Sequence, residues 1–343
     1  MNKKIILAGL ANNKTSLGEI FRRYITCFES FCKPDIFDLS DQIGNEEFKI
    51  GKYPQFTGII DHDIKYFHTT FGLYNNIKSS NPPIKKSDAK KIGYFVWESS
   101  ELHDRDVNVL KDFDEIWTAS NYCKDVFSQY IDSSLIKVVP HPIPAAKKIY
   151  KKYNKFTILI MGNVSSSVDR KNISANIEVA KIIKQKYKDV NIIFKTFTVS
   201  DNERSVLKNI IGNSKIKVID EYYPSEKVQD LIGKCHIILS LHRSEGFGLT
   251  LAEAMAVGTI PIATGYSGNV DFMKDPDTLI DYKLVDISIP YFKGQWAEPD
   301  IDDAVDKIIN IKNNMQNVVS FNFNYITENN SSETVTQIIK TII

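Results

Sequence analysis

Residues 244–256 read SEGFGLTLAEAMA, and this stretch decides the fold. It follows the apolar run CHIILSL at residues 235–241, which predicts a buried strand. After a turn that contains two glycines, Leu249, Ala252 and Ala256 fall on one face of a predicted helix. The segment is therefore expected to form a strand, a glycine-rich turn and a helix in immediate succession.

This succession favours a bound anion. At the start of such a helix the backbone N–H groups point outward and the helix dipole favours negative charge. Glu245 lies before the turn, and Glu253 lies one to two turns inside the helix. Carboxylates only accept hydrogen bonds, so two of them beside an anion site suit a nucleotide-sugar, which has hydroxyl groups on both sides of its phosphates. The alternative is a strand–turn–helix whose glutamates are solvated, which is common for any single turn of this kind.

The second half of the chain repeats this unit. Strands are predicted at residues 156–161, 191–197, 215–219, 235–241 and 259–263, and helices at residues 173–187, 202–211 and 225–232. Repeated strand–helix units predict an α/β protein with a parallel sheet covered on both faces. Ligands bind beyond the carboxyl ends of such strands. One edge is therefore expected to hold residues 162–167, 195–197, 221–223, 244–248 and 264–268.

The first half is less regular. Strands are predicted at residues 4–8, 56–60, 91–96, 115–118 and 136–139, and helices at residues 19–31, 101–113 and 121–130, with Ser120 as an N-cap. Two further helices are predicted near the end, at residues 300–309 and 334–343. The run PHPIP at residues 140–144 reads as a stiff linker. A length of 343 residues also favours two domains, so we expect domains at 1–140 and 141–325 and a C-terminal helix at 326–343.

The composition excludes several classes of protein. Lys and Arg total 43 against 42 for Asp and Glu, and this balance gives no global attraction to nucleic acid or an anionic membrane. The four cysteines have no metal-ligand spacing and are too sparse for a disulfide framework, which favours a cytoplasmic protein. The apolar run at residues 5–10 is too short for a signal peptide, and no run reaches the roughly 18 residues of a membrane span.

A second candidate anion site follows the strand at residues 156–161. Residues 162–172 read GNVSSSVDRKN, so a glycine and three serines precede Arg170 and Lys171 at the start of a helix. Two cations and serine hydroxyls are groups that bind a diphosphate. The alternative is a flexible loop with both cations in water, and the pattern alone favours neither interpretation.

Other catalytic patterns are weak or absent. Asp-x-Asp triplets occur at five places, several of them on predicted helices where the two carboxylates face different ways, so no metal site is predicted. The six histidines form no ligand cluster, although His62 and His103 follow strand-like runs that lead toward a cleft. A structural histidine is the commoner case for both. There is no Gly-x-Ser-x-Gly or Gly-x4-Gly-Lys-Ser/Thr motif, which argues against a hydrolase elbow and a P-loop NTPase.

These residues together resemble a known family. The two glutamates of residues 244–256, with seven residues between them, resemble the Glu-x7-Glu motif of retaining glycosyltransferases of family four. Those enzymes have the GT-B fold, in which two Rossmann-like domains face each other across a cleft, and the C-terminal helix can pack back on the first domain. The similarity covers roughly residues 91–310 and includes Pro261 and residues 93–98, 114–120, 138–142, 169–172, 265–272 and 296–300. The first 90 residues match only loosely.

The resemblance implies roles for donor-binding residues. Glu253 should bind ribose hydroxyls and Glu245 the donor sugar. Lys171, together with Arg170, should neutralise the diphosphate. The turn residues Gly246, Phe247, Gly248 and Leu249 should meet the phosphates or the sugar through N–H groups, and Gly162, Asn163, Thr196 and Tyr222 should complete the donor site, the last two around the base. Family members often have an arginine where Asn163 stands.

The resemblance also implies catalytic and acceptor-side residues. Glu245 and Lys171 are expected to be catalytic, with Glu98 as a third residue. Glu98 stands where many members have a histidine, and two roles are open to it: binding the donor sugar or polarising the acceptor hydroxyl. Gly18 and His103 are expected on the acceptor side.

The function implied is that of a metal-independent, retaining hexosyltransferase. It would move sugar from a UDP- or GDP-sugar to a glycan or lipid-linked acceptor in bacterial surface-polysaccharide assembly. The protein would be cytoplasmic, with at most peripheral contact at the inner face of the membrane. It would need no cofactor and would bind no nucleic acid. Two alternatives stay open: a GT-B hydrolase or epimerase of a nucleotide-sugar, and a non-catalytic nucleotide-sugar-binding subunit. Asn163 and the short first domain favour the latter.

Overall fold

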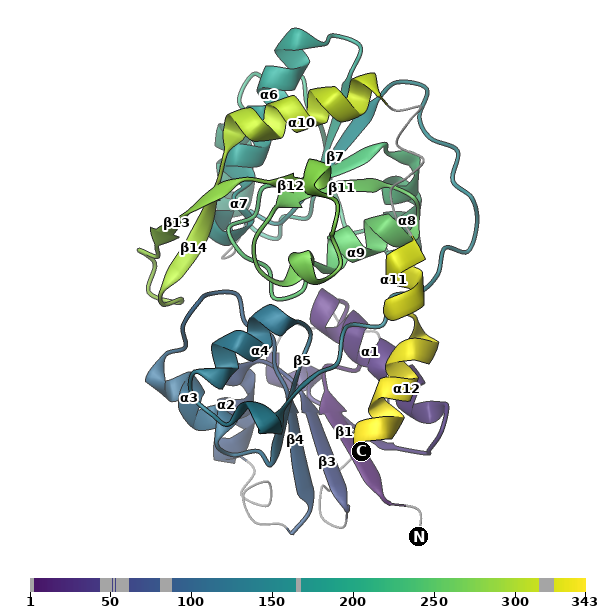
Figure 1. Cartoon of the computed structure of the whole chain (residues 1–343), viewed down its shortest axis with the longest axis vertical. Coiled ribbons are helices and arrows are strands. Elements are labelled where there is room, and N and C mark those ends of the chain that lie inside the picture. Colours follow the sequence, from purple (N-terminus) through teal and green to yellow (C-terminus); the bar gives the residue numbers. More distant parts are fainter. Residues whose placement is uncertain are drawn as a thin grey trace. The chain divides into compact units, whose positions relative to one another are not determined.

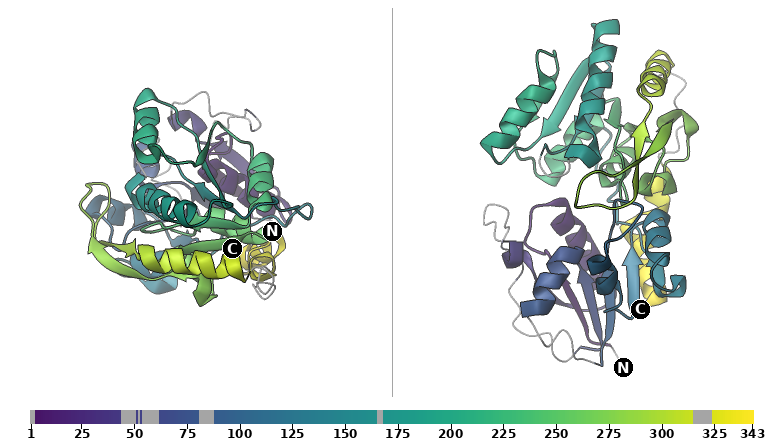
Figure 2. Two further views of the ribbon diagram at one scale, coloured as in Figure 1. Left: turned by 90° about the horizontal axis from the view of Figure 1, so that it is seen from above. Right: turned by 90° about the vertical axis from the view of Figure 1, so that its left-hand side faces the viewer.

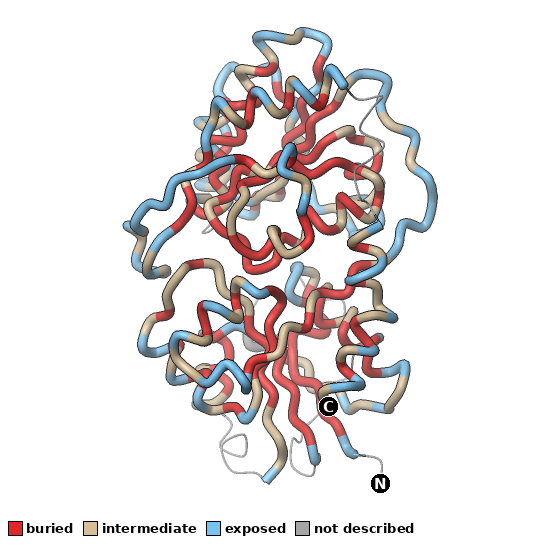
Figure 3. Tube along the Cα trace, in the orientation of Figure 1, coloured by how far each residue is buried: buried red, intermediate tan, exposed pale blue. Residues whose placement is uncertain are grey.

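Two compact units divide the chain in the computed structural model (Figure 1). Unit 1 consists of Met1–Pro142, Ile289–Gly294 and Asn329–Ile343, and unit 2 of Ile143–Ser288 and Gln295–Glu328. The structure describes residues 3–43, 51, 53, 62–80, 88–164, 168–314 and 324–343. Each unit has its own six-stranded parallel sheet whose central strands are buried (Figure 3), which confirms two Rossmann-like domains of the GT-B type.

Unit 1 contains a sheet in the order β2-β1-β3-β4-β5-β6, with every pair parallel. Its strands are β1 (Ile5–Gly9), β2 (Asp35–Asp38), β3 (Ile64–His68), β4 (Lys90–Tyr94), β5 (Glu115–Thr118) and β6 (Ile136–Val138). Its helices are α1 (Ser16–Glu29), α2 (Phe71–Ser80), α3 (Asp104–Leu110), α4 (Asn121–Ser128) and α12 (Ser332–Ile342). Ser120 caps α4 as predicted, because its Oγ accepts a hydrogen bond from Cys123 N at 3.2 Å.

Three elements of unit 1 escaped the sequence analysis, namely β2, β3 and α2. Strand β2 is a short edge strand with an aspartate at each end, so it lacks an apolar run. Strand β3 is fully buried, but it includes the polar residues Lys65 and His68, so its sequence lacks the continuous apolar run that predicts a buried strand. The strand predicted at residues 56–60 lies outside the described residues.

Helix α3 is shorter than the helix predicted at residues 101–113. It begins at Asp104, because Glu101 is paired with Lys293 instead of being helical. Glu101 forms an isolated antiparallel bridge with Lys293, its N–H donates to Lys293 O at 3.3 Å, and the two side chains pair at 3.0 Å. These residues therefore cannot continue the helix toward its N-terminus.

The core of unit 1 includes a buried polar network that holds the start of the proline run. Tyr24 Oη donates to Val139 O at 2.8 Å and to Pro140 O at 2.9 Å. Tyr94 Oη lies 3.0 Å from His141 Nδ1. Burial lowers the pKa of the neighbouring His68 to about 3, so its ring stays neutral. The first part of the run is thus packed against the sheet and is not a free linker.

The C-terminal helix α12 belongs to unit 1, as expected from the family resemblance. Its buried residues Val335 and Ile339 face the body of the unit, and it packs against α1. Cys27 Sγ on α1 donates to Ser332 O at 3.6 Å. The prediction that this helix packs on the first Rossmann-like unit is therefore confirmed.

Unit 2 has the sheet order β12-β11-β10-β7-β8-β9, again with every pair parallel, and its helices lie on both faces (Figure 2). The strands are β7 (Thr157–Met161), β8 (Asn191–Thr196), β9 (Lys217–Asp220), β10 (Ile237–Ser240), β11 (Ile260–Thr264) and β12 (Leu279–Ile280). The helices are α5 (Val168–Lys171), α6 (Ile173–Lys186), α7 (Asp201–Ile211), α8 (Ser225–Lys234), α9 (Leu249–Ala256), α10 (Ile301–Asn313) and α11 (Asn324–Asn329). All strands predicted in this half are present.

An antiparallel hairpin of unit 2 was not predicted. It pairs β13 (Tyr282–Asp286) with β14 (Gln295–Pro299), in the register that sets Lys283 opposite Glu298. All five residues of β13 are exposed, so its sequence has no buried alternation to reveal it. Within the described ranges, the chain has no helix with the length and apolar character needed to cross a bilayer.

The face predicted for α9 is wrong in part. The helix buries Leu251, Ala252, Ala254 and Met255, whereas Leu249 and Ala256 are only half-buried. Helix α9 packs against β10, β11 and α8 together, so a wide arc of its surface is covered. A helix that is apolar nearly all round gives no clear single stripe in its sequence.

Candidate functional site

Two segments of unit 2 that are far apart in sequence meet at one carboxylate. Glu245 Oε1, in the turn after β10, accepts a hydrogen bond from Lys171 Nζ. The same oxygen lies 3.3 Å from Arg170 NH1, which also donates to Ser244 O at 2.8 Å. Strands β7 and β10 are neighbours in the sheet, so the loops that follow them reach the same edge. This is where the strand order reverses, the usual ligand position in such sheets.

The Glu245 carboxyl is strongly acidic. Only 7% of the residue is exposed, and burial alone would raise the pKa of the carboxyl. The Lys171 ammonium and the Arg170 guanidinium outweigh burial and lower the pKa from 4.5 to about 2. Glu245 is therefore ionised throughout the neutral range. Its negative charge offsets the positive charges of Lys171 and Arg170.

The acidity of Glu245 predicts a pH-dependent contribution to stability. A folded-state pKa of about 2 against 4.5 corresponds to about 3 kcal/mol, fully present above the unfolded value of 4.5 and lost as the pH falls toward 2. Lys171→Ala should reduce the unfolding free energy most at neutral pH, and its deficit should shrink below about pH 4.5. Urea unfolding of both proteins between pH 3 and 7 measures this. A deficit that stays constant with pH would contradict the assignment.

The turn that carries Glu245 is fastened to a second loop. Glu245 N donates to Ser267 Oγ at 2.8 Å, and Gly268 N donates to Glu245 O at 2.8 Å. A Cβ on Gly268 would lie 2.3 Å from Gly246 O, so only glycine permits this approach. The buried His242 adds a contact between its Nε2 and Asn269 Oδ1 at 3.0 Å. The loop at residues 265–269 thus orients Glu245, whereas the sequence predicted only that residues 264–268 lie at the same edge.

The start of α9 has the predicted glycine-rich turn. Gly246, Phe247 and Gly248 are buried, and Phe247 packs against Phe272 with ring centroids 5.2 Å apart. Gly248 is the N-cap in a left-handed conformation with φ of 92°, and it offers no side chain to cap the helix. Leu249 is the first helical residue. The first turn of α9 therefore lies at the edge of the sheet, and no side chain of its N-cap residue bonds to its backbone N–H groups.

The remaining predicted donor residues lie at the ends of neighbouring strands. Gly162 and the exposed Asn163 follow β7, the buried Thr196 ends β8, and the exposed Tyr222 follows β9. Thr196 Oγ1 is buried without a hydrogen-bond partner among the described residues. Glu253 is half-buried on α9. Because all these strands are parallel, the structure brings these residues to the edge that holds Glu245.

The other three predicted residues belong to unit 1. Glu98 is half-buried in the segment after β4. His103 precedes α3 without capping it, and its Nε2 is buried and unpartnered among the described residues. Gly18 is required by packing, because a Cβ there would lie 2.1 Å from Asn13 O. Packing alone therefore explains why residue 18 is glycine.

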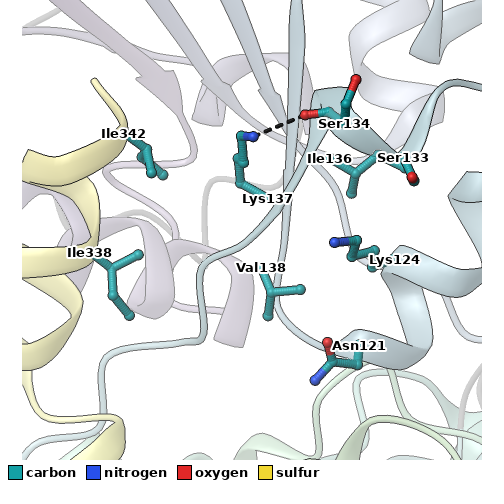
Figure 4. Close-up of a pocket in the computed structure, with 9 residues that line it drawn as sticks. All are labelled: Asn121, Lys124, Ser133, Ser134, Ile136, Lys137, Val138, Ile338 and Ile342. Carbon is teal, nitrogen blue, oxygen red and sulfur yellow. Dashed lines mark hydrogen bonds between the residues drawn. The ribbon is translucent and has the colours of Figure 1, made fainter.

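A separate pocket of about 500 Å³ lies in unit 1. It is formed by α4, β6 and α12, and Figure 4 shows Ile338 and Ile342 on one side and Lys124 on the other. Lys137 beside it donates through Nζ to Ser134 O at 2.9 Å. None of the predicted site residues lines this pocket.

A comparison with protein families decides the class of the chain. The family described as "Glycosyl transferases group 1" matches residues 143–318, just over half of the chain. The chain belongs to this glycosyltransferase family. The match spans α5, the Glu245 turn and β14, so the site built above lies inside it.

Several solved structures with the same fold are glycosyltransferases. A glycosyltransferase from Rickettsia africae has a TM-score of 0.69 at 15% identity, with 100% of this chain and 98% of that chain covered. HepE from Anabaena, solved with UDP-glucose, has a TM-score of 0.65 at 11% identity, with 99% of both chains covered.

TarM from S. aureus is a longer protein with this fold. A mutant of it, solved with fondaparinux, alpha-GlcNAc-glycerol and UDP, has a TM-score of 0.60 at 16% identity. The alignment covers 81% of this chain and 54% of TarM, so the chain spans about half the length of TarM. A search of curated proteins found no match.

Proposed function

We propose that this glycosyltransferase transfers a sugar from a nucleotide diphosphate sugar to an acceptor hydroxyl, and that the edge of the unit 2 sheet is its donor site. The observation that carries the proposal is the constellation of Lys171 and Arg170 on one loop and Glu245 on the next. It combines two cations for a diphosphate with one buried carboxylate for sugar hydroxyls. HepE and TarM, which share the fold, were solved with UDP-glucose and UDP, respectively.

The charges define the chemistry that this edge can perform. Cleavage of a sugar–phosphate bond leaves an electron-poor sugar and a diphosphate whose negative charge grows as the bond breaks. Lys171 and Arg170 stabilise that growing charge, together with the backbone at the start of α9. We propose that these two cations stabilise the leaving diphosphate and that the reaction needs no metal ion. Glu245, released from the cations when the diphosphate binds, then accepts hydrogen bonds from the donor sugar.

The remaining parts of the proposal concern the ribose, the acceptor and the setting. Glu253 would accept hydrogen bonds from the ribose, while Thr196 and Tyr222 flank the base, which is uracil or guanine. Glu98, Gly18 and His103 of unit 1 would serve a glycan or lipid-linked acceptor. We also propose retention of configuration and a role in bacterial surface polysaccharide, both from the family resemblance alone. We place this work in the cytoplasm, with at most peripheral contact at the inner face of the membrane.

A binding screen followed by product analysis tests the proposal. A UDP- or GDP-sugar should raise the melting temperature by several degrees at saturating concentration, because it binds only the folded state. The same donor should then yield free nucleotide and a glycosylated acceptor, with equal rates in the presence of EDTA. Nucleotide release that does not need an acceptor would indicate a hydrolase or epimerase, and binding without turnover would indicate a non-catalytic subunit. Either result would refute the proposal.

A further inference from the structure

Residues 169–172 carry the two cations, Arg170 and Lys171, and each of their four backbone carbonyls accepts a hydrogen bond. Asp169 O accepts from Arg243 NH1 at 3.0 Å, and Arg170 O accepts from Arg243 N at 2.7 Å. Asn176 Nδ2 donates to Lys171 O at 3.2 Å and to Asn172 O at 2.9 Å. A four-residue helix such as α5 has almost no hydrogen bonds of its own, so these outside donors determine where its side chains start.

Arg243 supplies two of those donors. It directly precedes Ser244, so its backbone is part of the same turn that holds Glu245. Its Nε donates to Glu298 Oε2 at 2.6 Å while NH1 donates to Asp169 O. The guanidinium thereby links the segment of Arg170 and Lys171 to β14, and two of its N–H groups face protein atoms.

Glu298 completes the arrangement from β14. Its second oxygen, Oε1, accepts from Asn172 Nδ2 at 3.3 Å. Ala297 N, beside it, donates to Arg243 O at 3.0 Å. Asn172 has a φ of 47°, a left-handed conformation that is uncommon for residues other than glycine and that persists where surrounding contacts support it. One carboxylate therefore fixes Arg243 and the residue that follows Lys171.

We propose that Arg243 and Glu298 are positioning residues for the donor diphosphate. They act through the placement of Lys171 and Arg170 and do not touch the substrate. Electrostatic stabilisation of a leaving group depends on cations that are already in place, and a misplacement of about 1 Å can cost on the order of a hundredfold in rate. This inference rests on the proposed function, because it assumes that the two cations receive the second phosphate of a nucleotide.

The test compares nucleotides that differ by one phosphate. Calorimetry would measure UDP against UMP, and GDP against GMP, for the wild type, Glu298→Ala and Glu298→Gln. Glu298→Ala should weaken diphosphate binding about tenfold and leave monophosphate binding unchanged, since only the second phosphate needs the cations. Glu298→Gln keeps one acceptor oxygen and should lose less. Glu226→Gln is the matched control, because Glu226 forms an exposed ion pair with Lys147 elsewhere in unit 2.

A double-mutant cycle separates positioning from a general loss of structure. If Glu298 acts through Lys171, then Glu298→Ala should have little further effect on diphosphate binding in a Lys171→Ala background. Equal losses for UDP and UMP, additive effects of the two substitutions, or no loss at all would each overturn the inference. A wild type that binds UDP no better than UMP would overturn it as well. A wild type that discriminates the two nucleotides but transfers no sugar would refute the proposed function alone.

Discussion

Replacing Lys171 by alanine is expected to lower the rate of sugar transfer about 100- to 1,000-fold at saturating donor. Losses of this size follow the removal of one preorganised group that stabilises charge as it develops. Lys171 is the natural candidate because its ammonium contacts the buried Glu245 and is itself half-exposed at the sheet edge. A diphosphate can therefore take the place of Glu245 at the ammonium. Steady-state rates with a radiolabelled donor measure the effect.

The control for this prediction is Lys147→Ala. Lys147 forms an exposed ion pair with Glu226, so its removal changes the net charge by the same amount. It should leave the transfer rate within about twofold, since exposed pairs contribute little. Lys171→Arg should retain part of the activity because it keeps the charge. If Lys171→Ala transferred sugar as fast as the control, the diphosphate would not lie where we place it.

Replacing Glu245 by glutamine is expected to change catalysis and nucleotide binding in opposite directions. Without donor, Glu245 pairs with both Lys171 and Arg170. A free nucleoside diphosphate must displace this carboxylate, so the neutral glutamine should strengthen UDP or GDP binding by about threefold to tenfold. Transfer should nevertheless fall by about tenfold to a hundredfold, because a charge-assisted hydrogen bond to the sugar is worth about 1.5–3 kcal/mol.

The two readouts are calorimetry with the free nucleotide and initial rates with the complete donor. Glutamine has nearly the same shape as glutamate, and the hydrogen bonds to Ser267 and Gly268 come from the backbone of residue 245, so the fold should be retained. Glu226→Gln again serves as the control for the loss of one negative charge, because its ion pair is exposed. Weaker binding of the free nucleotide together with an unchanged transfer rate would contradict the role assigned to Glu245.

The sequence predicted unit 2 well because its signals are local. Most strands of its parallel sheet are short apolar runs, most of its long helices have an amphipathic period, and Gly246 and Gly248 mark the turn between β10 and α9. The failures have equally local causes. Strand β3 is buried with Lys65 inside it, β13 is exposed along its whole length, and α9 is covered too widely to show a stripe.

The same locality limits what could be predicted about the site. The resemblance placed Arg170, Lys171 and Glu245 in one donor site, with the cations on the diphosphate and Glu245 on the donor sugar, and it did not predict that they contact one another. Their direct contact depends on the adjacency of β7 and β10, although 74 residues separate Lys171 from Glu245. Ser267 was predicted only as one of residues 264–268 at the ligand edge. Arg243 was not selected, because one arginine among polar neighbours has no distinguishing pattern.

The sequence by itself determined the alternation of strands and helices, the glycine turn before α9 and the family of the chain. Periodicity and turn chemistry act over a few residues, so they can be read without knowing what lies opposite in space. Only the tertiary structure decided that Glu245 neutralises Lys171 and Arg170, and that Arg243, paired with Glu298 of β14, contacts the backbone of the segment that carries those cations. Electrostatic and hydrogen-bonding partners depend on distance in space, which the order of strands in the sheet sets and local sequence does not record.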